Sequence, residues 1–131
     1  MRIFVVEDST QTRHELVNLL AGIEGVAVVG EAGTVSEALA GIESTAPEAV
    51  VLDILLPDGS GVEVLKHCRR RGCNLSVVVL TSNLYEGLQV KCKQLGAVAV
   101  LDKINGLAQV RDVAAGLQSG FRKASNESSC L

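Results

Sequence analysis

Aromatic residues are scarce in this chain, which has two Phe, one Tyr and no Trp among 131 residues. Its core must therefore be packed by aliphatic side chains. A platform that stacks the bases of single-stranded nucleic acid needs exposed aromatic rings along a basic groove. The net charge of -3 at pH 7 also leaves the chain without the positive surface that phosphate backbones require. Direct binding of nucleic acid is therefore not expected.

Long apolar runs and paired cysteines are also missing. No segment approaches the roughly 20 apolar residues of a membrane span, and the charge of Glu7 interrupts the first apolar run too early for a signal peptide. The cysteines form no Cys-x-x-Cys pair. We therefore expect a soluble cytoplasmic protein without membrane contact, whose reduced thiols are Cys68, Cys73, Cys92 and Cys130.

Length and composition point to one packed domain. A chain of 131 residues is too short for two ordinary domains. With 47% hydrophobic and 21% charged residues, it can bury a core and is not expected to be disordered. We predict a domain over residues 1–122 and a flexible, serine-rich tail over residues 123–131.

Apolar runs and helical stripes alternate along the chain. The runs predict strands at residues 1–6, 26–29, 50–53, 75–80 and 97–101. The stripes predict helices at about 10–22, 34–46, 61–71, 84–95 and 107–121, with Ser9 and Thr34 as N-caps and Gly96 as a C-cap. This alternation predicts an α/β fold: a doubly wound, flavodoxin-like parallel sheet of order 2-1-3-4-5 between two layers of helices.

One acidic residue stands at the end of the most apolar strand. Residues 50–52 form a continuous apolar run, typical of a strand that is covered on both faces, and Asp53 follows directly. The next residues include Pro57 and two glycines, which favour a loop. Ligands gather at the carboxyl ends of parallel strands. Asp53 is therefore a candidate functional carboxylate.

Other polar residues follow the remaining strands. Because strands 1 and 3 are neighbours in the predicted order, the carboxylates of Glu7, Asp8 and Asp53 should crowd into one crevice. Mg²⁺ or Mn²⁺, which take oxygen ligands, would relieve the repulsion. Lys103 and the hydroxyl of Thr81 supply a charge and a donor for a phosphoryl oxygen. This set predicts Asp53 as a nucleophile that forms an aspartyl phosphate.

Together these residues resemble the receiver domain of bacterial two-component response regulators, in particular the single-domain, chemotaxis-regulator type. The residues that carry the likeness are Glu7-Asp8, Asp53 with Pro57 and Gly61 four and eight positions later, Thr81 and Lys103. The likeness covers essentially the whole chain. It implies that Asp53 accepts a phosphoryl group from a histidine kinase or a histidine phosphotransfer protein.

The resemblance also implies a metal site. Asp8 and Asp53 would hold Mg²⁺ directly, and Glu7 would act mainly through a metal-bound water. The backbone carbonyl of Leu55 would complete the coordination. The protein would be a phosphoacceptor in signalling rather than an enzyme, because it would catalyse only its own phosphotransfer and dephosphorylation.

Three positions depart from the family pattern. Thr81 and Lys103 would bind the phosphoryl oxygens, but Val100 stands where the family often has an aromatic switch residue. Ile104 stands in place of the usual proline after the lysine, and Ser82 in place of a small alanine. A valine has no ring to rotate, so coupling between a threonine and an aromatic ring cannot be the output mechanism.

The resemblance assigns roles to several surface positions. Leu55 and Asn83 occupy the positions that tune hydrolysis of the aspartyl phosphate, and an apolar Leu55 should hinder an attacking water. Ser9, Thr10 and Arg13, beside Asp8, are candidates for contact with the kinase.

An output surface is also implied. An unidentified downstream protein would bind the face made by the predicted helix 84–95, the strand 97–101 and the helix 107–121. The residues of these helices on that face are Lys91, Gln94, Gln109 and Arg111. The domain itself would be a monomer or a weak dimer.

Other functions compete with this interpretation. A haloacid-dehalogenase-type phosphatase needs a second aspartate two residues after the nucleophile, where Leu55 stands. In a flavin-binding protein, Glu7 and Asp8 would repel the flavin phosphate, and aromatic residues to sandwich the ring are lacking. An interaction domain that works without phosphorylation stays open. So does a receiver fragment of a longer, for example DNA-binding, regulator.

Overall fold

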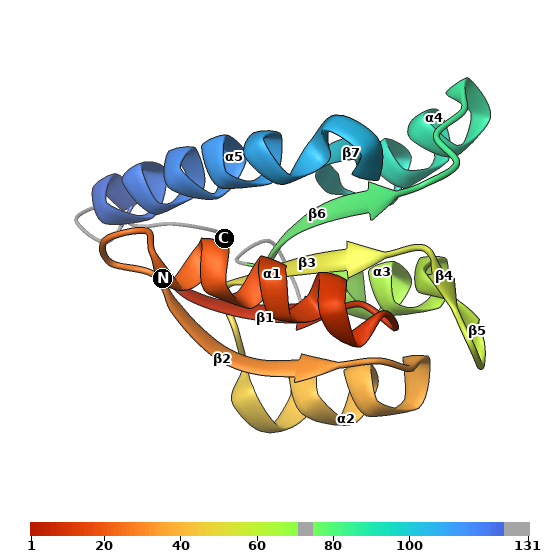
Figure 1. Cartoon of the computed structure of the whole chain (residues 1–131), viewed down its shortest axis with the longest axis horizontal. Helices are drawn as coiled ribbons and strands as arrows, with labels where there is room; N and C mark the ends of the chain where they lie inside the picture. The colour runs from red at the N-terminus through yellow and green to blue at the C-terminus, as the bar shows by residue number, and fades with distance from the viewer. Residues whose placement is uncertain (71–74, 125–131) are drawn as a thin grey trace.

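A parallel sheet forms the centre of the molecule (Figure 1). The computed structural model describes residues 1–70 and 75–124. The strands of the sheet are β1 (Arg2–Val6), β2 (Ala27–Ala32), β3 (Ala49–Asp53), β6 (Ser76–Thr81) and β7 (Ala97–Asp102). Their order is β2-β1-β3-β6-β7 and all pairs are parallel, which confirms the predicted doubly wound order 2-1-3-4-5.

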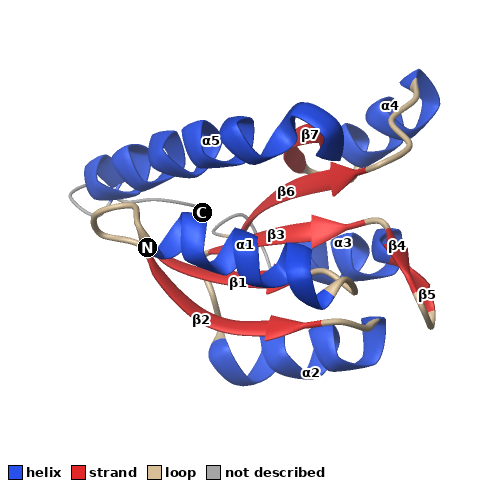
Figure 2. Ribbon diagram, in the orientation of Figure 1, coloured by secondary structure: helices blue, strands red, loops and turns tan. Residues whose placement is uncertain are grey.

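Helices cover both faces of this sheet (Figure 2). One face carries α1 (Thr10–Ala21) and α5 (Lys103–Ala124), and the other carries α2 (Val35–Thr45), α3 (Gly61–Arg70) and α4 (Glu86–Gln94). Successive strand side chains point to opposite faces. Ile3 and Val5 of β1 therefore join the core with α1 and α5, whereas Phe4 and Val6 join the core with the other helices.

Polar caps begin two helices as predicted. Ser9 accepts a hydrogen bond from the amide of Thr12 at the start of α1 (3.3 Å), and Thr34 accepts one from the amide of Glu37 at the start of α2 (3.1 Å). Gly96 follows α4 with a φ of 97°, a conformation that glycine adopts readily after a helix.

Several boundaries differ from the prediction. β2 does not close at Gly30 but continues to Ala32, because residues 30–32 pair with residues 4–6 of β1. α4 begins at Glu86 rather than near residue 84. α5 begins at Lys103 rather than near residue 107, and it runs to Ala124. Ile104 follows Lys103, so no proline disfavours helical geometry at Lys103 itself.

The loop after Asp53 contains a small hairpin that was not predicted. Its strands are β4 (Leu55–Leu56) and β5 (Gly59–Ser60), paired antiparallel. Strands of two residues leave no periodicity in a sequence, so the turn-forming residues alone indicated a loop. The hairpin places Gly61 at the start of α3, directly after β5.

The buried ring of Phe4 needs two glycines beside it. Phe4 is 2% exposed. A β carbon on Gly30 would lie 2.6 Å from its ring, and one on Gly41 would lie 2.4 Å from it. Both glycines therefore leave space that the ring fills, one from β2 and one from α2.

In the described part of the chain, no helix is long and apolar enough to span a bilayer. Cys68 and Cys92 are buried in the core with α2, α3 and α4. The described residues do not include Cys73 or Cys130. They also do not include residues 125–131 of the predicted tail 123–131.

Candidate functional site

Polar residues that follow four strands meet at one edge of the sheet. Glu7 and Asp8 follow β1, Asp53 ends β3, Thr81 ends β6 and Lys103 follows β7. Carboxylate oxygens of Glu7, Asp8 and Asp53 lie within 4.8 Å of one another. The fold thus brings together the three carboxylates that were expected to crowd into one crevice.

The three carboxylates differ in exposure. Glu7 is 1% exposed and Asp53 is 3% exposed, whereas Asp8 is exposed to solvent. A buried carboxylate is costly unless opposite charge or hydrogen bonds compensate it. Solvent therefore reaches the site at Asp8 but not at Glu7.

Lys103 compensates the two buried carboxylates. Its Nζ donates to both oxygens of Glu7, at 2.7 and 3.0 Å, and to Oδ2 of Asp53 at 2.8 Å. Burial lowers the pKa of Lys103, but its hydrogen bonds with Asp53 and Glu7 outweigh that effect and raise it. Lys103 therefore stays protonated as the cation of this site.

The backbone around Asp53 is tightly packed. The amide of Leu55 donates to Oδ1 of Asp53 at 3.1 Å, and the amide of Gly61 donates to the carbonyl of Ile54 at 2.7 Å. A β carbon on Gly61 would lie 2.2 Å from the backbone oxygen of Asp53. The glycine eight residues after Asp53 thus allows α3 to start directly against the end of β3.

Thr81 in β6 and Val100 in β7 are both buried. Thr81 is 1% exposed, and its hydroxyl oxygen accepts from the amide of Asn83 at 3.2 Å. Val100 is 6% exposed and packs in the core with α2, α3 and α4. Ser82, by contrast, is exposed. A small buried side chain thus fills the position at which the resemblance led us to expect an aromatic residue.

The charges of the site fit a divalent cation. When ionised, the three clustered carboxylates carry more negative charge than the single positive charge of Lys103 can balance. Their oxygens are the hard ligands that Mg²⁺ prefers. The exposed carboxylate of Asp8 gives an ion a side from which to enter. The residues present therefore suit the metal that the sequence predicted.

Glu7 should make the stability of the metal-free protein depend on pH. Burial, together with the hydrogen bond to Asp53, raises the pKa of Glu7 from 4.5 to about 7 despite the nearby Lys103. Between these values the folded protein holds a proton that the unfolded chain releases, so the free energy of unfolding falls as the pH rises. Relative to Glu7→Gln, the wild type should lose up to about 3 kcal/mol from pH 4.5 to 7.

Urea unfolding in EDTA at several pH values measures this loss. Glu15→Gln, at an exposed position of α1, is the control and should keep the wild-type slope. A constant stability difference between wild type and Glu7→Gln across this window would contradict the prediction.

The residues expected to contact the kinase lie beside Asp8. Ser9 and Thr10 are exposed, but Arg13 is half-buried and its guanidinium is already hydrogen-bonded within the molecule. A contact that the sequence did not indicate involves Asp58, which accepts from the amides of Val35 at 2.7 Å and Ser36 at 3.1 Å. These bonds lower the pKa of Asp58 and fasten the loop after Asp53 to the start of α2.

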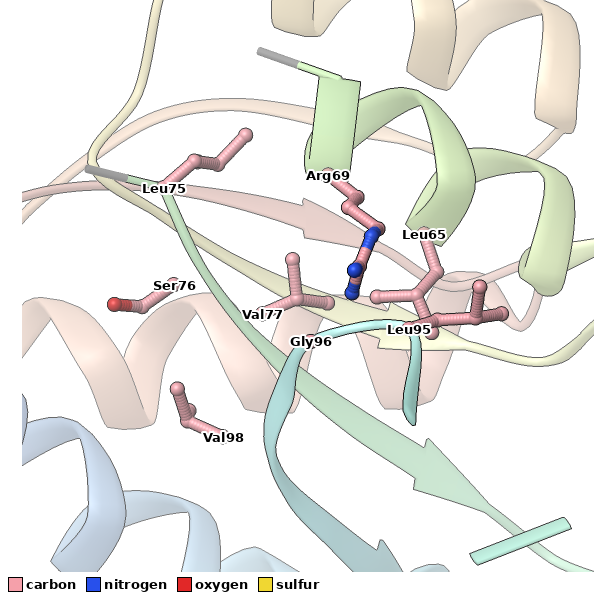
Figure 3. Close-up of a pocket in the computed structure, with 8 residues that line it drawn as sticks. All are labelled: Leu65, Arg69, Leu75, Ser76, Val77, Leu95, Gly96 and Val98. Carbon is pink, nitrogen blue, oxygen red and sulfur yellow. The ribbon is translucent and has the colours of Figure 1, made fainter. Parts of the chain in front are cut away.

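A separate cavity lies at the opposite edge of the sheet (Figure 3). Its volume is about 390 Å³, and its lining includes Leu65, Arg69, Val77 and Val98. Ser76 and Ala97 begin β6 and β7, so the cavity adjoins the strand starts rather than the carboxyl ends. It therefore has no part in the acidic site.

Comparison with known proteins agrees with this geometry. Residues 3–115 match the family model of the response regulator receiver domain. The chain is 36% identical over 120 residues to the DNA-binding transcriptional activator DevR/DosR of Mycobacterium tuberculosis, covering 88% of this chain and 55% of that protein. It is 30% identical over 108 residues to a protein-glutamate methylesterase/protein-glutamine glutaminase of Treponema denticola, covering 81% of this chain and 29% of that protein.

The chain thus spans about half the length of the first relative and under a third of the second. A solved structure matches over nearly its whole length. The response regulator domain of Thermotoga maritima CheB has a TM-score of 0.76 and 28% sequence identity, with 98% of each chain covered. Because the family model matches most of its residues, this chain belongs to the response regulator receiver domain family.

Proposed function

We propose that Asp53 is the residue of this receiver domain that accepts the phosphoryl group. A carboxylate oxygen of Asp53 attacks the phosphorus of a phosphohistidine on a histidine kinase or phosphotransfer protein. The O–P bond forms, the N–P bond breaks and the imidazole leaves. The observation that carries this proposal is the Asp53 carboxylate, within 4.8 Å of the other two carboxylates and 2.8 Å from Nζ of Lys103.

Mg²⁺, with Mn²⁺ as a substitute, is the proposed cofactor. Asp8 and Asp53 would hold it directly, Glu7 through water, and the backbone carbonyl of Leu55 would be the further ligand. When bound, the ion neutralises the acidic cluster and the charge on the transferring oxygens. The clustered oxygens of the three carboxylates support this assignment.

Lys103 and Thr81 are proposed to bind the phosphoryl oxygens once Asp53 is esterified. Lys103 now donates to Oδ2 of Asp53 and is also the first residue of α5. A shift of Lys103 towards the new oxygens would therefore move the start of α5 directly. This route needs no rotating ring at position 100. Val100 is buried on the other face of the sheet from α5, in the core with α2, α3 and α4.

The output is proposed to be a change in protein binding at the face of α4, β7 and α5. Its predicted residues are all exposed: Lys91, Gln94, Gln109 and Arg111. Val90 of α4 and Val98 of β7 add apolar surface, at 48% and 49% exposure.

The domain could work alone or within a longer regulator. The relatives named above include a DNA-binding activator and a methylesterase, both longer than this chain. We propose a phosphoacceptor without further catalytic activity, in the cytoplasm, with residues 1–122 as the receiver. A receiver that is part of a longer regulator would use the same site.

Phosphorylation by a small donor tests the central proposal. With phosphoramidate and Mg²⁺, the intact protein should gain the mass of one phosphoryl group, and EDTA should prevent the gain. Hydroxylamine should then release the group, because it cleaves acyl phosphates and not phosphate esters of serine or threonine. No mass gain would favour an interaction domain that works without phosphorylation.

Leu55 should slow hydrolysis of the aspartyl phosphate. Leu55 is 59% exposed and its amide donates to Oδ1 of Asp53, so an exposed apolar residue lies two positions after the acceptor. Leu55→Asn, which can orient water, is expected to speed loss of the phosphoryl group about fivefold, equivalent to about 1 kcal/mol in the barrier. Loss of radiolabel from purified phosphoprotein measures the rate.

Val90→Asn is the matched control, because it makes the same kind of change at an exposed position of α4. Its hydrolysis rate should equal that of the wild type. An unchanged or slower rate for Leu55→Asn would show that Leu55 does not limit the access of water.

A further inference from the structure

Arg13 of α1 makes two hydrogen bonds beside the acidic site. Its Nη1 donates to the backbone carbonyl of Glu7 at 2.7 Å, and its Nε donates to Oε1 of Glu31 at 3.1 Å. The side chain of Arg13 is 20% exposed, whereas that of Glu31 is 51% exposed. The guanidinium is thus held between the turn after β1 and the end of β2.

Gly33 leaves the space in which this guanidinium lies. A β carbon at Gly33 would be 3.0 Å from Nη1 of Arg13, 3.7 Å from the carbonyl oxygen of Glu7 and 3.8 Å from Cα of Asp8. The loop after β2, the guanidinium and the turn between Glu7 and Asp8 are therefore packed against one another.

The turn that carries Glu7 and Asp8 is anchored at both backbone polar groups of Glu7. The amide of Glu7 donates to the carbonyl of Ala32 at 2.9 Å, which continues the ladder between β1 and β2. The carbonyl of Glu7 accepts from Arg13. Since this carbonyl begins the peptide that leads to Asp8, its orientation decides where the Asp8 carboxylate is presented.

From these contacts we infer that Arg13 is a positioning residue for the metal site, an inference that rests on the proposed function. Repulsion among three carboxylates favours movement of Asp8, the exposed member, away from Asp53. Arg13 resists this movement through the Glu7 carbonyl. The planar guanidinium can serve this carbonyl and Glu31 together, which an ammonium group cannot do in the same geometry.

The sign of the effect separates positioning from charge alone. Arg13 is a cation near the site, so its removal would strengthen Mg²⁺ binding if its charge were all that mattered. If Arg13 positions the turn, its removal weakens Mg²⁺ binding. Groups that orient metal ligands typically change metal affinity by 10- to 100-fold when they are replaced.

The test compares Arg13→Met with Arg69→Met. Arg69 also donates from Nη1 to a backbone carbonyl, that of Gln94 at 2.8 Å, but it lines the cavity at the opposite edge of the sheet. We expect Arg13→Met to raise the Kd for Mg²⁺ about tenfold and Arg69→Met to leave it unchanged, with Mg²⁺ alone as the titrant. Arg13→Lys should also bind Mg²⁺ more weakly than the wild type, because lysine keeps the positive charge but not the paired donors of the guanidinium.

Amide hydrogen exchange in EDTA gives a second measurement that needs no metal. In Arg13→Met the amides of residues 8–12 should exchange faster relative to the rest of the domain, and in Arg69→Met they should match the wild type. Normalising to core amides of β3 separates this local effect from a general loss of stability.

Two results would overturn the positioning role. One is a Kd for Mg²⁺ that is unchanged or lower in Arg13→Met, and the other is exchange of residues 8–12 that is unchanged in EDTA. If the wild type itself binds no Mg²⁺, the proposed metal site fails, and the exchange measurement then decides the role of Arg13 in holding the turn.

Discussion

Replacing Asp53 with asparagine is expected to abolish phosphorylation by phosphoramidate completely. The amide of asparagine cannot form the acyl phosphate. Glu7 is buried and bonded to Lys103 through both of its oxygens, so it is not available as a substitute. The mass of the intact protein after incubation with Mg²⁺ and the donor measures the result, and Asp53→Asn should show no gain.

Two further aspartates control this experiment. Asp112→Asn, at an exposed position of α5, should be phosphorylated like the wild type. Asp8→Asn should be phosphorylated more slowly, because it keeps the nucleophile but loses a proposed metal ligand. A full mass gain in Asp53→Asn would mean that another residue accepts the phosphoryl group.

Replacing Gly61 with alanine is expected to lower the free energy of unfolding by roughly 3 kcal/mol or more. The added carbon would lie 2.2 Å from the backbone oxygen of Asp53 and 2.9 Å from Cα of Ile54. Both are backbone atoms, so either α3 or the end of β3 must move. Urea unfolding measures the loss, and phosphorylation should also slow because Asp53 moves with the backbone.

Gly116→Ala is the matched control for this substitution. A β carbon at Gly116 meets nothing within 4 Å, and the residue is exposed within α5. Alanine favours a helix over glycine, so this variant should gain roughly 0.5–1 kcal/mol. A wild-type unfolding midpoint for Gly61→Ala would show that the close approach of α3 to Asp53 is not needed.

The elements and their order could be predicted because they depend on local patterns and on general rules of connection. Continuous apolar runs end at Asp53 and before Glu7, and the helical stripes between them require right-handed crossovers. The same reasoning placed the carboxylates at one edge of the sheet. Boundaries were predicted less well where pairing decides them, as at Gly30, which stays in β2 because it pairs with Phe4.

Contacts between distant segments could not be predicted from those patterns. A sequence shows that Lys103 follows a strand, but not that its ammonium bonds to both Glu7 and Asp53. Likewise, the sequence predicts a loop after Asp53, but not that the carboxylate of Asp58 in this loop accepts from the first two amides of α2. Such pairs depend on distances of a few ångströms between side chains that only the assembled layers bring near.

The amino-acid sequence alone was thus sufficient for the fold class, the strand order and the membership of the acidic cluster, since each follows from periodicity and from the chemistry of residues at strand ends. The packed molecule decided which groups bond to one another. The sequence indicated a kinase contact for Arg13, which stays a prediction, but it did not indicate that Arg13 donates to the carbonyl of Glu7, where Gly33 leaves room for its guanidinium. Hydrogen-bond partners depend on this three-dimensional fit, which periodicity does not encode.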